Sequence, residues 1–127
     1  MTARSPSQPP PVFDGQMLAA MFGNEPQLIA SVLHTFRVSV GGSMQDILSA
    51  LEHADLQAVG TIAHRIKGAC HVSGTLALAE AAQQVESAAR EGTIAAARLA
   101  GAQLERQWQL VQNDPALHAA CSSIQGP

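Results

Sequence analysis

The sequence contains little charge and few aromatic residues. Of its 127 residues, 13% are charged and 3% are aromatic, with one Trp, three Phe and no Tyr. The hydrophobic fraction is nevertheless 46%, so most apolar residues are aliphatic. An aliphatic, Ala-rich composition favours helices around a core of many small aliphatic side chains. A β-sandwich would need more aromatic and β-branched runs. A chain of this length suffices for one domain with one core.

Basic clusters and long apolar runs are also missing. The net charge is -3 and the lysines and arginines do not cluster, which excludes nucleic acid as a partner. No apolar run approaches the roughly 20 residues of a membrane span, and no signal-peptide core is present near the N-terminus. We therefore expect a cytoplasmic domain without direct membrane contact, although a sensor-kinase parent chain could tether it to the inner membrane.

Cysteine and metal-ligand patterns are equally sparse. Cys70 occupies an apolar helix position and Cys121 lies near the C-terminus, so the two cysteines indicate a reducing compartment rather than a disulfide framework. We expect Cys70 to pack as a small hydrophobe. His64 and His71 are about two helical turns apart, too far to share one ion without further ligands. No metal site is expected.

Apolar residues at helical spacing predict one short helix and four main helices. A Ser/Pro-rich linker precedes them over residues 1–12, and a flexible tail is expected over 113–127, with a loose turn around 116–120. The helical domain is expected over 13–112. The expected helices cover residues 14–22, 26–53, 56–73, 76–91 and 94–112.

Start and stop signals support these boundaries. Asn24 is a good N-cap for the second helix, with Pro26 in its first turn, whereas the glycines at 41 and 42 predict a kink or break at 38–42. Asp55 and Gly74 bound the central helix. Because the connections are short, consecutive helices should be antiparallel neighbours. The predicted fold is an all-α, antiparallel up-down four-helix bundle with a short extra N-terminal helix.

The central helix has an apolar face and an unusually bare opposite face. On a helical wheel, the residues opposite His64 are apolar or small: Val59, Ile62, Ile66, Ala69 and Ser73. Those on its own side are Gln57, Gly60, Thr61, Lys67, Gly68 and His71. Glycine inside a helix costs about 1 kcal/mol relative to alanine, so two glycines beside a histidine indicate a surface that a partner must reach.

The chemistry of that face is nucleophilic. A neutral imidazole is a nucleophile near physiological pH, and Lys67 lies one turn from His64, within reach of an anion held at the ring. Along the helix, His64 has no acid, Ser or Cys constellation that would support hydrolysis by this chain alone. Glu80, Glu86, Arg90 and Glu91 of the following helix are read as a mixed, solvated face.

These residues resemble a known family. The pattern Ala63-His64-x-x-Lys67-Gly68, followed by Gly74, Leu78-Ala79 and Val85-Glu86, resembles the histidine phosphotransfer (HPt) domain of bacterial multistep phosphorelays, over roughly 13–111. The resemblance implies a four-helix bundle. With its Pro-rich lead-in and short tail, the chain is similar to the C-terminal HPt module of a hybrid sensor histidine kinase. The alternatives are a free-standing protein and a domain at the start of a chemotaxis-type histidine kinase.

The resemblance also implies residue roles. His64 would be phosphorylated on Nε2 by a receiver-domain aspartate and would pass the group to another receiver. Lys67 would steady the phosphoryl group, and Glu86 would bind the other imidazole nitrogen and fix its tautomer. The expected receiver-docking surface consists of Gly60, Thr61, Gly68 and His71.

Two functional hypotheses follow. In the first, the chain is a phosphocarrier and not an enzyme; it needs no cofactor of its own, because the receiver supplies Mg²⁺ and an acidic pocket, and it is monomeric. In the second, the chain is a helical adaptor or dimerisation module in which His64 is incidental. An adaptor would be expected to place apolar anchors, not glycines, on the exposed face.

Overall fold

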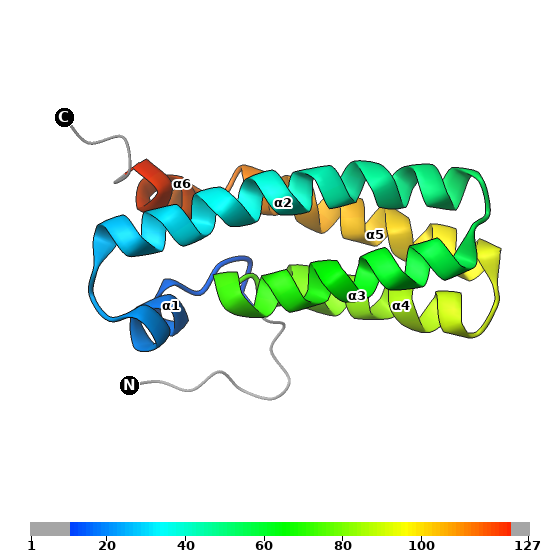
Figure 1. Ribbon diagram of the computed structural model, residues 1–127, viewed down its shortest axis with the longest axis horizontal. Coiled ribbons are helices and arrows are strands. Elements are labelled where there is room, and N and C mark those ends of the chain that lie inside the picture. The colour runs from blue at the N-terminus through cyan, green and yellow to red at the C-terminus, as the bar shows by residue number, and fades with distance from the viewer. Residues whose placement is uncertain (1–10, 123–127) are drawn as a thin grey trace.

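Six helices make up the described part of the chain, residues 11–122 of the computed structural model. They are α1 (Gly15–Phe22), α2 (Pro26–Glu52), α3 (Leu56–Ser73), α4 (Leu76–Arg90), α5 (Ile94–Gln112) and α6 (Pro115–Ser122). Helices α2 to α5 form an elongated antiparallel bundle, and α1 and α6 lie at the end where α2 begins (Figure 1). The predicted four-helix bundle with an extra N-terminal helix is confirmed. Within residues 11–122, no helix combines the length and the hydropathy that a bilayer crossing demands.

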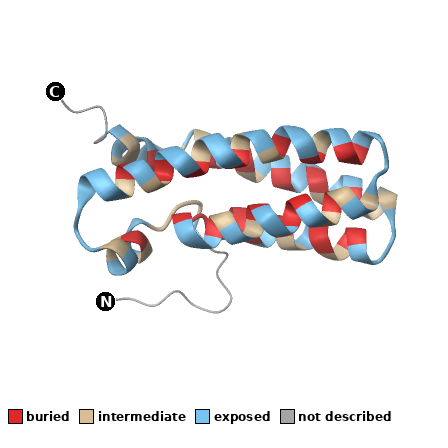
Figure 2. Ribbon diagram, viewed as in Figure 1, coloured by how far each residue is buried: buried red, intermediate tan, exposed pale blue. Residues whose placement is uncertain are grey.

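The core is built from one face of each main helix. Figure 2 shows the buried residues along the inner sides of the bundle helices. Most are aliphatic, and the largest fully buried side chains include Leu33, Ile47, Ile66, Leu78 and Leu104. Each such side chain stabilises the fold by about 1.5–3 kcal/mol relative to an exposed position. Trp108 is also buried and meets Phe36 edge to face, with ring centroids 6.0 Å apart.

The sequence predicts a kink or a break at 38–42; helix α2 is continuous there, so the predicted break is wrong. The buried residues on both sides of the glycine pair, Phe36, Val40, Met44 and Ile47, keep one helical register. A Cβ at Gly41 would lie 3.8 Å from Trp108, an ordinary contact distance, so α2 and α5 pack closely there. Core packing on both sides of the pair offsets the intrinsic cost of two glycines, about 1 kcal/mol each.

The start of α2 also differs from the prediction. Glu25, rather than Asn24, occupies the N-cap position and makes no side-chain cap hydrogen bond. Pro26 is the first helical residue, and its fixed φ suits that position, so the residue before it becomes the cap.

Residues 115–122 form α6, so the expectation of a flexible tail is wrong for this segment. Asp114 accepts a hydrogen bond from the Leu117 backbone N–H at 3.0 Å, and Leu117 is fully buried. The Asp114-Pro115 pair therefore ends α5 and also starts a helix. Residues 123–127 and residues 1–10 of the predicted linker lie outside the described residues. The Pro11 carbonyl accepts a hydrogen bond from the Ala77 N–H at 3.4 Å, so the last part of that linker contacts α4.

Both ends of α3 follow the sequence signals. Asp55 Oδ1 accepts a hydrogen bond from the Ala58 N–H at 3.1 Å, and Gly74 terminates the helix in the left-handed conformation with φ 75°. The chain before α1 crosses this end, where the Asp14 N–H donates to the Gly74 carbonyl at 2.7 Å. A Cβ at Gly74 would stand only 2.7 Å from the Asp14 carbonyl oxygen. Glycine is therefore required here by both conformation and space.

Replacing Gly74 by alanine should destabilise the protein more than the same change at Gly92. Gly92 also has a positive φ, 79°, but a Cβ there meets no atom within 4 Å. Gly92→Ala should lower the free energy of unfolding by about 1 kcal/mol, the cost of a left-handed alanine. Gly74→Ala adds a backbone clash and should lower it by at least about 2 kcal/mol. Urea denaturation measures both, and equal losses would contradict the close approach of Asp14.

Candidate functional site

His64 projects from the middle of α3 on the side away from the core. Its side chain is 69% exposed, whereas Ile62 and Ile66 of the same helix are buried. The helical-wheel prediction for this histidine is confirmed. Solvent and a partner protein can therefore reach the imidazole without any rearrangement of the bundle.

The Nδ1 atom of His64 lies 3.0 Å from Oε2 of Glu86, which comes from α4. Burial alone would raise the pKa of the Glu86 carboxyl, but the hydrogen bond and charge of Lys67, together with those of His64, hold this pKa below its ordinary value. Glu86 is therefore ionised at neutral pH and can only accept hydrogen bonds. It follows that Nδ1 carries a proton and that, in the neutral imidazole, Nε2 is the nitrogen with the lone pair.

Lys67 is held beside the histidine by α4. Its Nζ donates to Oε1 of Gln83 at 2.7 Å and to Oε1 of Glu86 at 3.2 Å. Gln83 in turn donates from Nε2 to the Ser87 hydroxyl at 3.0 Å. The structure thus places Lys67 close to His64, as predicted, and adds Gln83 as a partner that sequence reasoning missed.

Arg90 completes a cluster with His64, Lys67 and Glu86, and sequence reasoning also missed it. Its guanidinium donates to Oε2 of Glu86 at 3.1 Å across one turn of α4. The i, i+4 spacing of Glu86 and Arg90 was the available signal. The reading of Glu86 as part of a solvated face is wrong, because this residue is 8% exposed. Every ion pair found within residues 11–122 includes Glu86.

The expected docking residues surround this cluster. Gly60 and Thr61 line a shallow hollow together with His64, Glu86 and Arg90. A Cβ added at Gly68 would meet no atom within 4 Å, so the surface there is open.

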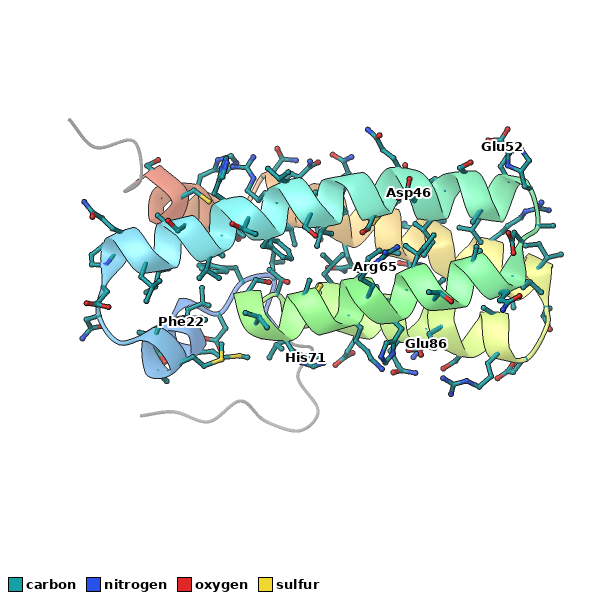
Figure 3. The ribbon with its side chains drawn as sticks, viewed as in Figure 1. Phe22, Asp46, Glu52, Arg65, His71 and Glu86 are labelled. Atoms are coloured by element: carbon teal, nitrogen blue, oxygen red, sulfur yellow. The ribbon has the colours of Figure 1, made fainter. Side chains whose placement is uncertain are left out.

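Two other residues of α3 can be placed relative to the cluster. His71 is exposed, and Figure 3 shows it with Glu86 on the edge of the α3–α4 pair turned away from α2. Arg65 lies on the edge of α3 nearer α2 and so takes no part in the cluster.

Cys70 is not part of the site. It is fully buried, and burial raises the pKa of its thiol to about 11, so it remains a neutral core residue as predicted. Among the side chains of residues 11–122, no three histidines, cysteines or carboxylates come together as potential metal ligands.

The site is chemically incomplete by itself. It offers an exposed nucleophilic nitrogen, a proton held on the other nitrogen, and two cations placed to offset negative charge. The His64 side chain is 69% exposed, so a reacting group and a partner surface can reach the imidazole. These features suit transfer of an anionic group between proteins.

Comparisons with known proteins agree with this geometry. A family model described as the Hpt domain matches residues 31–114. Among solved structures, the chain is similar to the crystal structure of histidine-containing phosphotransfer protein B (HptB) from Pseudomonas aeruginosa PAO1, with a TM-score of 0.76 and 25% sequence identity, covering 91% of this chain and 96% of that chain. No match was found among curated proteins.

The family model covers most of the bundle and includes α3 and α4, which supply the cluster around His64. The hypothesis of an adaptor with an incidental histidine is therefore not favoured. The chain belongs to the Hpt domain family: it is a histidine phosphotransfer domain of phosphorelays, which works with response-regulator receiver domains.

Proposed function

We propose that His64 is the residue that carries the phosphoryl group. It receives the group from a phosphorylated aspartate of one receiver domain and passes it to an aspartate of another. The observation that carries this proposal is the asymmetry of the imidazole: Nδ1 is bound to a buried carboxylate, while the ring as a whole is 69% exposed. The buried contact orients the ring and leaves Nε2 as the reacting atom.

The transfer step balances without a further reactant. The Nε2 lone pair forms the N–P bond as the P–O bond to the receiver aspartate breaks, and the electron pair of that bond returns to the aspartate carboxylate. Onward transfer is the same exchange in reverse with a second receiver. The chain acts in this proposal as a carrier and not as an enzyme, and the receiver contributes its own acidic pocket and metal ion.

Lys67 and Arg90 would offset the charge of the phosphoryl group. Both cations contact Glu86 through hydrogen bonds of 3.2 and 3.1 Å, so each is already placed within a short movement of the imidazole. Charge-assisted hydrogen bonds to phosphoryl oxygens are stronger than neutral ones. Since α3 and α4 of one chain supply the whole cluster, one copy is sufficient for the function.

Gly60, Thr61, Gly68 and His71 would form the surface on which the receiver docks. The absence of side chains at the glycines allows another backbone or helix to approach the imidazole closely. The open space above Gly68 supports this role most directly.

Replacing His64 by glutamine should abolish phosphoryl uptake. The chain would be incubated with a labelled, phosphorylated receiver and Mg²⁺, and the label on this chain should be acid-labile and base-stable. His34→Gln, at an exposed position on α2, is the matched control and should accept label as the parent does. Uptake by the His64→Gln chain at the parental level would overturn the assignment.

Lys67→Ala should slow transfer by about tenfold or more, because a charge-assisted hydrogen bond to the phosphoryl group is lost. Circular dichroism should show a folded bundle, since Lys67 lies outside the core. Arg106→Ala, an exposed change on α5, controls for loss of one positive charge. Transfer kinetics equal to those of the parent would remove Lys67 from the site.

Gly68→Gln should block receiver docking while slightly stabilising the helix. Glutamine is favoured over glycine in a helix by about 0.5–1 kcal/mol, yet its side chain would occupy the open surface. Gly42→Gln is the matched control, because Gly42 is also helical and also meets no atom within 4 Å. A Gly68→Gln chain that transfers as fast as the Gly42→Gln chain would contradict a docking surface at Gly68.

A further inference from the structure

We infer that Glu86 keeps the proton on Nδ1 of His64 after the phosphoryl group has been attached, so that the phosphorylated ring stays ready to pass the group on. This inference rests on the assignment of His64 as the phosphoacceptor. It goes beyond orientation of the ring, because it gives the negative charge of Glu86 a role in the second half of the transfer.

The geometry separates the two sides of the imidazole. The His64 side chain is 69% exposed, but the Glu86 side chain, whose carboxylate accepts the hydrogen bond from Nδ1–H, is only 10% exposed. Oε2 of Glu86 is 3.0 Å from Nδ1, and Oε1 is engaged by Lys67 at 3.2 Å. The proton therefore faces a buried carboxylate whose two oxygens both accept hydrogen bonds, one from His64 and one from Lys67.

The chemistry requires that proton for onward transfer. When Nε2 forms its bond to phosphorus, the ring carries a formal positive charge for as long as Nδ1–H is retained. Breaking the P–N bond then returns the electron pair to Nε2, releases a neutral imidazole and forms a P–O bond to the next aspartate. If the Nδ1 proton had been lost to solvent, the leaving group would be an imidazolate anion, which leaves far more slowly.

The charge of Glu86, and not only its hydrogen bond, stabilises the protonated ring. A neutral amide could accept the same hydrogen bond but would not offset the positive charge of the ring. Glu86 would also repel the phosphoryl group, yet Lys67 and Arg90 carry two positive charges against its one, which leaves the cluster with a surplus of one positive charge. Phosphoryl binding and proton retention are therefore compatible.

The charged groups that face His64 come from two helices. Helix α3 contributes Lys67, and α4 contributes Glu86 and Arg90. Asp46 of α2 and Arg65 of α3 lie on the other side of α3 in Figure 3. The pH dependence of the phosphorylated ring should therefore respond to Glu86 and not to the carboxylates of α2.

The test follows the phosphorylated ring directly. The full chain would be phosphorylated with phosphoramidate, and the pH dependence of its phosphorus-31 NMR shift would give the midpoint at which the ring loses its proton. The signal of interest is the one missing from the His64→Gln chain. Glu86→Gln should lower that midpoint by at least about one pH unit, while Glu80→Gln, an exposed change on the same helix, should leave it unchanged.

Transfer to a receiver provides a second readout. At alkaline pH, Glu86→Gln should slow release of the phosphoryl group to the receiver by about tenfold. The reason is that a midpoint one pH unit lower leaves about a tenth as much of the ring protonated. At mildly acidic pH, where the ring is protonated in both chains, the rates should converge. A loss of activity that is the same at every pH would indicate a merely structural role and would overturn the inference.

A measurement on the unsubstituted chain covers the case in which Glu86→Gln fails to fold. The pH at which the phosphorylated ring loses its proton, measured by phosphorus-31 NMR, should be at least about one unit higher in the folded chain than in the same chain unfolded in urea. Equal midpoints, or a lower one in the folded chain, would overturn the inference. If no signal disappears in the His64→Gln chain, the assignment of His64 itself fails instead.

Discussion

The buried carboxylate of Glu86 is the interaction on which the site depends. Its two oxygens receive hydrogen bonds from His64, Lys67 and Arg90 at 3.0 to 3.2 Å. Removing an anion from water is costly, and here three partners offset that cost without burying a salt bridge completely. Because the same carboxylate contacts all three, it sets the tautomer of the histidine and also places both cations around it.

That contact exists only because α3 and α4 pack side by side. His64 and Glu86 are 22 residues apart and lie on different helices. The turn between the helices is fixed by Gly74, whose left-handed conformation ends α3 and whose carbonyl receives the Asp14 N–H. The buried faces of both helices point into one core, so their polar faces meet along a single outer edge. Packing of the buried faces of α3 and α4 thus places the site on the surface of the bundle.

Local signals predicted part of this arrangement. The bare face around His64 and the ends of α3 at Asp55 and Gly74 could be read from residue types and spacing, because capping and helical periodicity act over a few residues. The continuity of α2 could not be read in this way, because it depends on packing against Trp108 of α5 and on the apolar residues on both sides of Gly41. The i, i+4 spacing of Glu86 and Arg90 could be read from the sequence, but the burial of Glu86 could not. Arg90 was therefore assigned to a solvated face.

By itself, the sequence determined a helical bundle with an exposed histidine, a lysine one turn away and open space at Gly68. Helical periodicity is sufficient for those conclusions, because it places residues on a face without reference to other elements. The tertiary structure alone decided that Glu86 is buried, that Gln83 and Arg90 join it, and that residues 115–122 form a helix. The physical reason is that burial and ion pairing depend on which faces of different helices meet, and the spacing within one helix does not specify that.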